Sequence, residues 1–176
     1  FVLREPMGVC ALINAWNMPL VMAATKLAPA LACGNTCVLK PAEQSPLSTI
    51  RLAELIEQAG LPPGVVNVVP GFGASAGAAL AEHPDIDKIA FTGETRTGAT
   101  LMKTASDGIK RVSLELGGKS PNIVFADADI AKAAAAAVKG AFGNAGQSCS
   151  ARTRVFVERP VHDEFVTAFS HATTRF

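Results

Sequence analysis

The sequence has 176 residues, of which 49% are apolar and 18% charged, and its formal net charge at pH 7 is +1. This composition predicts one folded domain, or one domain and part of a second, and argues against a disordered chain. A charge this small, with no run of Lys and Arg interleaved with aromatic residues, argues against nucleic-acid binding.

No segment has the pattern of a signal peptide or of a membrane span. The most apolar stretch, residues 18–33, contains Lys26 and Pro29 and is too short to cross a bilayer. We therefore expect neither secretion nor membrane insertion.

The four cysteines lack CxxC spacing and have no histidine near them in the sequence, which argues against a zinc site and predicts no bound metal. Three of them are expected to be small buried apolar side chains: Cys10, Cys33 and Cys37. Free cysteines in a chain of this size favour a reducing compartment, so we expect a cytoplasmic protein.

Short apolar runs alternate with helical patterns, which is typical of a parallel α/β sheet. In chain order we expect strands at 8–13, 36–39, 65–69, 88–91 and 111–116, separated by helices at 18–33, 46–59, 74–82 and 95–105. Ser45 is expected to cap the second helix, with Pro46 in its first position. This βαβ repetition resembles a Rossmann-like parallel sheet with flanking helices.

The pattern changes at Gly117-Gly118, where we place a domain boundary. Beyond it we expect strands at 122–125 and 153–157, an alanine-rich helix at 129–138 and a helix from 161 onward. Residues 1–116 are predicted to be a partial dinucleotide-binding domain, and 117–176 the start of a second α/β domain that is catalytic. Because the chain begins without Met and stops within a helical pattern, we expect a fragment of a longer protein.

Cys149 is the candidate nucleophile, since a thiolate attacks carbonyl carbon readily. It follows Gly146-Gln147-Ser148, and Gly143 and Gly146 leave room beside the sulfur. The polar neighbours argue against a core strand, although a buried inert cysteine is the alternative from the residues alone.

Two further side chains have chemically suggestive positions. Glu115 interrupts an otherwise buried strand just before two glycines, and the carboxyl edge of an open α/β sheet is where ligands bind. The alternative is an ordinary exposed glutamate at a strand end. Asn17 follows the first strand, where its amide can donate to an oxyanion or its side chain can cap a helix.

Glycine-rich turns follow the third and fourth strands: Gly71-Phe-Gly73 with Gly77, and Phe91-Thr-Gly-Glu-Thr95 with Gly98. Either turn can bring a helix N-terminus to a pyrophosphate, although neither is the standard GxGxxG after the first strand. Lys40-Pro-Ala-Glu43 follows the second strand, where a carboxylate suits ribose hydroxyls and an ordinary loop is the alternative.

Six segments match known motifs in order: Ala15-Trp-Asn-Met-Pro-Leu20, Lys40-Pro-Ala-Glu-Gln-Ser-Pro-Leu47, Pro70-Gly-Phe-Gly73, Phe91-Thr-Gly93, Glu115-Leu-Gly-Gly-Lys-Ser-Pro121 and Gly146-Gln-x-Cys149. Over essentially its whole length the sequence therefore resembles the aldehyde dehydrogenase family. The resemblance implies that Cys149 is the nucleophile, Glu115 the general base, and the Asn17 amide with the Cys149 backbone N–H the oxyanion hole.

The same resemblance implies NAD as the cofactor, rather than NADP. Lys40 and Glu43 would hold the adenosine ribose. The rest of the cofactor site would be lined by Ile13, Ala15, Trp16, Asn17, Gly73, Gly77, Phe91, Thr92, Gly93, Glu94, Gly98 and Leu116.

The implied reaction oxidises a small-molecule aldehyde to a carboxylic acid through a cysteine thiohemiacetal and a thioester, and the full-length protein would be a homo-oligomer. Glu115 favours hydrolysis of the thioester over transfer to coenzyme A. Two alternatives stay open: a dinucleotide-binding fragment without turnover, and a thiol hydrolase, which needs a histidine base. None of His83, His162 and His171 has an evident link to Cys149.

The sequence departs from the family pattern in two places and lacks two of its segments. Ala15 stands where the motif has proline. Glu94 stands where the family usually has serine, and a glutamate at this position resembles the branch of hydroxymuconic-semialdehyde dehydrogenases. The later Glu-x-Phe-Gly-Pro motif and the oligomerisation strand do not occur. We therefore expect the 176 residues alone to be inactive and to expose apolar side chains at Val124, Phe125, Val155 and Phe156.

Overall fold

The structure is a computed structural model that describes residues 1–176. The chain divides into two compact units, Phe1–Leu116 and Gly117–Phe176. The predicted α/β fold with a five-stranded parallel sheet is confirmed. The assignment of a dinucleotide-binding role to one unit and a catalytic role to the other stays a prediction.

Unit 1 contains five parallel strands: β1 (Val9–Ile13), β2 (Thr36–Lys40), β3 (Val66–Val68), β4 (Lys88–Gly93) and β5 (Arg111–Leu116). Their order across the sheet is β3-β2-β1-β4-β5. Strands β2 and β3 lie on one side of β1, and strands β4 and β5 lie on the other. The carboxyl ends of β1 and β4 therefore form a topological switch point, where open α/β sheets bind ligands.

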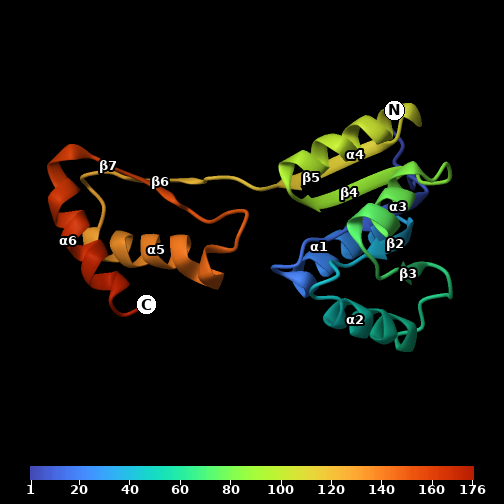
Figure 1. The fold of residues 1–176 in the computed structure, drawn as a ribbon, viewed down its shortest axis with the longest axis horizontal. Helices are drawn as coiled ribbons and strands as arrows, with labels where there is room; N and C mark the ends of the chain where they lie inside the picture. The colour runs from blue at the N-terminus through green and yellow to red at the C-terminus, as the bar shows by residue number, and fades with distance from the viewer. The chain divides into compact units, whose positions relative to one another are not determined.

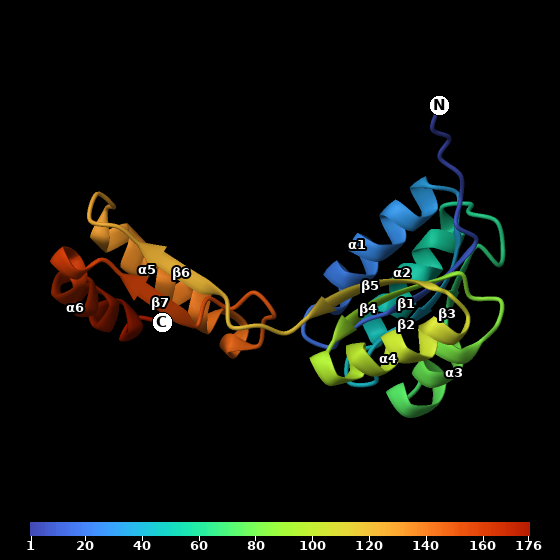
Figure 2. The same cartoon turned by 90° about the horizontal axis from the view of Figure 1, so that it is seen from above.

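Helices cover both faces of this sheet: α1 (Pro19–Ala32), α2 (Leu47–Gln58), the π-helical turn η1 (Gly73–Gly77) leading into α3 (Ala78–Glu82), and α4 (Thr95–Asp107). Figure 2 shows α1 and α2 on one face and α3 and α4 on the other. Each face of the sheet has its own apolar cluster. One contains Ala11, Ile13, Ile89, Phe91 and Leu101. The other, on the α1 and α2 side, contains Cys10, Leu12, Leu27, Cys37 and Leu39.

Strand β5 is an edge strand, and it differs from the fully buried strand that its apolar residues suggested. Exposed and half-buried positions alternate along it, and Glu115 is on the exposed face. Its inner face packs against α4, where Gly98 is buried against Leu116. A Cβ at Gly98 would lie 2.7 Å from Leu116 Cδ2, so the absence of a side chain allows this close approach of helix to strand.

Two local predictions in unit 1 were wrong. Cys33 is exposed rather than buried, because it follows the last turn of α1 and lies off the helix face that carries Ala23 and Leu27. Ser45 does not cap α2, whose N-cap position is Pro46 with no side-chain cap hydrogen bond. The Ser45 hydroxyl instead donates to the Trp16 carbonyl at 2.8 Å, which joins two loops at the carboxyl edge of the sheet.

Unit 2 consists of a parallel pair, β6 (Pro121–Val124) and β7 (Arg154–Val157), with two helices, α5 (Ile130–Phe142) and α6 (His162–Thr173) (Figure 1). Short 3₁₀ turns follow α5 at Gly143–Gly146 (η2) and precede α6 at Arg159–Val161 (η3). Asp129 caps α5 by accepting a hydrogen bond from the Lys132 N–H at 3.1 Å. The helix runs four residues beyond the predicted end at 138.

The apolar residues of this small sheet divide between its two faces. Val124 is buried and Val155 packs beside it against the helices, contrary to the expectation that both would be exposed. Phe125 and Phe156 are exposed, as expected. The alternation of a strand explains the difference, since neighbouring side chains point to opposite faces.

None of the helices combines the length and the apolar character that crossing a bilayer requires.

Candidate active site

The predicted site residues of unit 1 gather at the carboxyl edge of the sheet. Asn17 follows β1, Lys40 ends β2, Thr92 and Gly93 end β4, and Glu115 lies near the end of β5. Since these strands are parallel neighbours, the structure brings to one edge residues that are up to 98 positions apart in the sequence, from Asn17 to Glu115. The edge includes the switch point between β1 and β4.

Glu115 is next to Thr92 in the β4–β5 register, and both side chains lie on the α1 side of the sheet. Lys26 of α1 reaches this pair, and its ammonium donates to Thr92 Oγ1 at 2.6 Å. Burial lowers the pKa of Lys26 to about 8, and the negative charge of Glu115 partly opposes that shift. The candidate base therefore has a cation near it whose charge changes close to neutral pH.

The sequence did not predict that Lys26 belongs to the candidate site, and this residue was considered only as evidence against a membrane span. The signal that could have found it is its position on α1. Lys26 lies three and four residues after Ala23 and Met22, which are both buried, so it is on the face of the helix that packs against the sheet. An ammonium on such a face requires a polar or charged partner.

The turn that carries Asn17 leads directly into α1. Met18 occupies the N-cap position of that helix with no side-chain cap hydrogen bond, and Pro19 begins it. The N-cap position of α1 is therefore Met18, one residue after Asn17. Trp16 is half exposed beside it, and its carbonyl accepts the Ser45 hydroxyl.

Lys40 and Glu43 form an ion pair at the carboxyl end of β2. Lys40 is only 2% exposed, and its ammonium donates to the Pro41 carbonyl at 2.8 Å and lies 3.5 Å from Glu43 Oε2. Gly77 borders the stem of this lysine, where a Cβ would lie 3.6 Å from Cδ. Glu43 remains about a third exposed, so its carboxylate can accept hydrogen bonds from a ligand.

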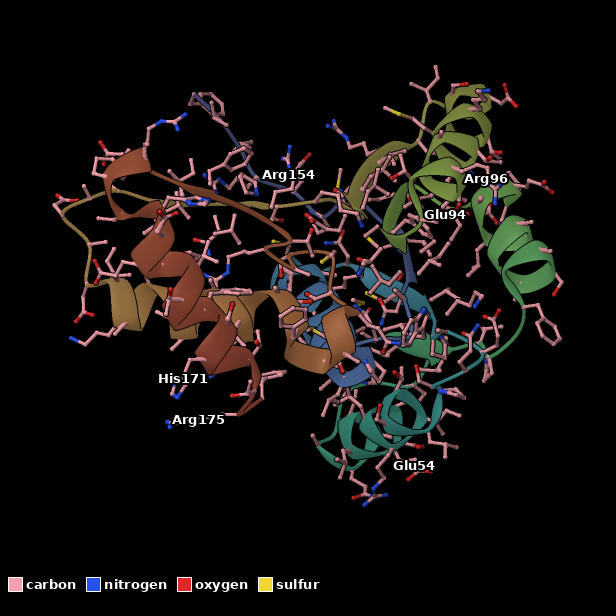
Figure 3. All side chains as sticks on the ribbon, turned by 60° about the vertical axis from the view of Figure 1, so that its left-hand side comes forward. Glu54, Glu94, Arg96, Arg154, His171 and Arg175 are labelled. Atoms are coloured by element: carbon pink, nitrogen blue, oxygen red, sulfur yellow. The ribbon has the colours of Figure 1, made fainter.

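At the turn between β4 and α4, Glu94 occupies the N-cap position without capping the helix. Its carboxylate lies 3.3 Å from Arg96, and Figure 3 shows both residues at the beginning of α4. The acidic side chain that departs from the family motif is thus balanced by a cation two residues later. The N–H groups of the first turn remain available to an anion.

Cys149 is exposed in unit 2, which contradicts the interpretation of a buried inert thiol. The chain approaches it through left-handed backbone at Asn144, Ala145 and Gly146, with φ of 55°, 55° and 74°. Cys149 then lies in a turn in which the Ala151 N–H donates to the Ser148 carbonyl at 3.1 Å. A Cβ at Gly118 would lie 3.6 Å from the Cys149 carbonyl oxygen, so these two backbone segments are neighbours.

Within unit 2, no histidine hydrogen-bonds to this thiol. His83 Nδ1 accepts the Asp85 N–H at 3.2 Å, and His162 pairs with Asp163 at 2.9 Å. His171 lies in the last turn of α6. Nowhere do three or more His, Cys, Asp or Glu side chains gather as a metal site would require.

Comparison with known proteins identifies the family. The model of the aldehyde dehydrogenase family matches residues 1–176. This chain belongs to the aldehyde dehydrogenase family. It is 58% identical to aldehyde dehydrogenase 1A1 of Gallus gallus and 56% identical to retinal dehydrogenase 2 of Homo sapiens, in each case over 94% of the chain. These matches cover 33% and 32% of the relatives, so the chain spans about a third of their length.

Solved structures agree with this assignment. Aldehyde dehydrogenase C of Pseudomonas syringae, a mutant in complex with NAD⁺ and octanal, superposes with a TM-score of 0.93 at 51% identity, over 97% of this chain and 35% of that one. An NAD-dependent aldehyde dehydrogenase from Sinorhizobium meliloti gives a TM-score of 0.96 at 45% identity, over 98% and 34%. The suggested link between Glu94 and the hydroxymuconic-semialdehyde branch stays a prediction.

Proposed function

We propose that the full-length protein oxidises aldehydes to carboxylic acids with NAD, and that Cys149 forms the covalent bond to the substrate. The observation that carries this proposal is the exposed thiol of Cys149 on a defined turn, in a chain that matches the aldehyde dehydrogenase family throughout. By the same proposal, residues 1–116 are the dinucleotide-binding domain and 117–176 the beginning of the catalytic domain.

In the proposed reaction the Cys149 thiolate attacks the carbonyl carbon of the aldehyde. The Asn17 amide and the Cys149 backbone N–H donate to the oxygen that becomes negative. Bound NAD would supply the hydride acceptor, and the oxidised substrate carbon would remain on Cys149 as a thioester. Glu115 then takes a proton from water, the water oxygen adds to the thioester carbon, and the C–S bond breaks to release the acid and the Cys149 thiolate.

The residues of unit 1 fit a dinucleotide. The N-terminus of α4 has no side-chain cap and lies at the switch point, so its free N–H groups suit a pyrophosphate. Glu43 has an accessible carboxylate for ribose hydroxyls, and buried Lys40 fixes its position. Thr92 and Gly93 end β4 just before this helix.

This site should prefer NAD to NADP in kcat/KM, because the Glu43 carboxylate repels a 2′-phosphate. Lys40 offsets part of that repulsion. We expect Glu43→Gln to reduce the NAD-to-NADP ratio by about tenfold, which corresponds to about 1.4 kcal/mol. Steady-state kinetics with both cofactors measure the ratio, and Glu54→Gln on exposed α2 is the matched control. A wild-type preference for NADP would contradict the assignment of Glu43.

The hydrolysis step should accelerate as pH rises through about 8, the pKa of Lys26. Below that pH the Lys26 ammonium is charged and repels a proton that moves from water toward Glu115. Above it the positive charge is lost, and this repulsion with it. In Lys26→Met this inflection should disappear from the pH profile of thioester hydrolysis, measured in single-turnover experiments.

Lys88→Met is the control for this pH profile. Lys88 is on the same face of the sheet, but at the beginning of β4, where it donates to Ser113 Oγ at 2.8 Å. This variant should keep the inflection near pH 8. An unchanged inflection in Lys26→Met would show that another group titrates.

The rival function is dinucleotide binding without turnover. An aldehyde-mimicking thiol reagent separates the two, because a catalytic Cys149 should react selectively and the rate should change when NAD is present. Equal labelling of Cys149 and the exposed Cys33, with no effect of NAD, would favour the rival. Family resemblance also leads us to propose a homo-oligomer, and the free thiols a cytoplasmic location.

A further inference from the structure

Three polar side chains of unit 1 are withdrawn from solvent without a hydrogen-bond partner. Both polar atoms of the Asn14 carboxamide are in this state, as are the hydroxyls of Ser48 and Thr49. Asn14 is 5% exposed and Thr49 is 1% exposed. Native proteins seldom leave such groups unpaired, and a buried water molecule is the usual partner.

These side chains belong to one region of the fold. The Asn14 N–H donates to the Lys40 carbonyl at 3.0 Å and so continues the β1 ladder beyond Ile13. By the alternation of a strand, its side chain points to the same face as Leu12. Figure 2 shows α1 and α2 on one face of the sheet, and the cluster that contains Leu12 is on that face. It therefore lies on that face at the carboxyl edge of the sheet.

Ser48 and Thr49 reach the same face from the first turn of α2. Leu52, one turn further along the helix, packs against the cluster that contains Leu12. The hydrogen bond from Ser45 to the Trp16 carbonyl holds the beginning of this helix against the turn that follows Asn14. The unpaired atoms of both segments are thus on the α1 and α2 side of the sheet, and the bond from Ser45 joins their two loops.

The chemistry of these groups defines what they can bind. The carboxamide offers two N–H donors and one acceptor, and each hydroxyl can both donate and accept. All three are neutral, and the ammonium of Lys26, which is also on this face, donates to Thr92. Such a set suits a small neutral molecule that donates and accepts hydrogen bonds, which is water.

We propose that Asn14 and Thr49 bind an ordered internal water, and that this hydrated contact positions the turn carrying Asn17. The sequence supplies a reason for such a contact, because Ala15 stands where the family motif has a proline. Proline fixes its own φ, and alanine leaves this turn free to rotate. Asn14 is therefore a positioning residue for the oxyanion donor, an inference that rests on the proposed function of Asn17.

The test uses Asn14→Leu in the full-length enzyme, which keeps the side-chain size and removes the polar atoms. We expect kcat to fall about tenfold while the Kd for NAD changes less than twofold, since the proposed role of Asn17 is to donate to the oxygen of the substrate. Asn14→Ser, which retains a group that can bind water, should keep most of the activity. Adding Ala15→Pro to Asn14→Leu should recover most of the lost kcat, because the turn is then fixed covalently.

A double-mutant cycle locates the effect. In an Asn17→Ala background, Asn14→Leu should lower kcat less than twofold, because the group that it positions is already absent. A fully additive loss, or an unchanged kcat in Asn14→Leu, would overturn the positioning role. If Asn17→Ala itself keeps full kcat, the oxyanion assignment fails, and that result is separate from the water site.

The water is tested directly by a high-resolution crystal structure of the wild-type enzyme. We expect density within hydrogen-bond distance of the Asn14 carboxamide and of Thr49 Oγ1, and its loss in Thr49→Val but not in Thr49→Ser. A dry site, or a carboxamide bonded to protein groups alone, would overturn the inference whether or not the leucine variant folds. NAD binding by each variant reports that its unit 1 is intact.

Discussion

Cys149→Ala in the full-length protein should lower the rate of aldehyde oxidation by a factor on the order of 10⁴ or more, while NAD binding stays close to that of the wild type. The thiol forms the covalent bond to the substrate, and no other group of its turn can replace a sulfur nucleophile. Cys149 is exposed in unit 2 and is not part of the apolar cluster of that unit, so its removal leaves no cavity there. The loss should therefore appear as a change in chemistry and not in folding.

Steady-state NADH production with a panel of aldehydes measures this effect, and fluorescence titration measures NAD binding. Cys33→Ala is the matched control, because Cys33 is also a free and exposed thiol but lies at the end of α1. It should retain wild-type turnover. Appreciable oxidation by the Cys149 variant, close to the wild-type rate, would contradict the assignment.

The sequence predicted the elements of unit 1 well because their signals are local. Strand lengths, helix ends at glycines and the alternation of strands with helices depend on a few neighbouring residues. The long helix α4 was placed from Thr95 to within two residues of its end. The boundary between the two units, at Gly117, lies where the alternation of strands and helices is interrupted.

Features that depend on distant residues were predicted poorly. Nothing near Ser45 indicates that its hydroxyl bonds to Trp16, which is 29 positions away. The apolar residues of β5 suggested burial, but its place at the edge of the sheet depends on strand order, which its own sequence does not encode. Lys26 gained a role only when the fold brought it to Thr92, 66 positions along the chain.

In the candidate site, too, local features were predicted from the sequence and contacts with distant residues were not. Cys149 and Glu115 attracted attention in the sequence because each lies near glycines and is an unexpected residue type for its segment. The resemblance to a family then implied their roles. The surroundings of each came from the structure: the left-handed approach to Cys149, the cation near Glu115, and Arg96 beside Glu94. Residue type thus indicated the chemistry, and packing determined its electrostatic environment.

Glu115→Gln should separate the two halves of the reaction. Formation of the thiohemiacetal and hydride transfer do not need this carboxylate, so the first turnover should still release a burst of NADH. Hydrolysis of the thioester should slow by roughly 10²- to 10⁴-fold, because glutamine cannot take the proton from water. The substitution keeps the shape of an exposed side chain on edge strand β5, and we expect the fold to tolerate it.

Stopped-flow absorbance at the NADH band resolves this burst from the steady state, and its amplitude should approach one NADH per active site. Added hydroxylamine, which attacks thioesters directly, should restore turnover in the variant, because it replaces the water that Glu115 no longer activates. Glu57→Gln, an exposed glutamate of α2, is the control and should show wild-type kinetics. If Glu115→Gln instead turns over at the wild-type rate, Glu115 is not the base; if it loses the burst as well as the steady state, the carboxylate acts before the thioester forms, and the order of steps proposed for this site must be revised.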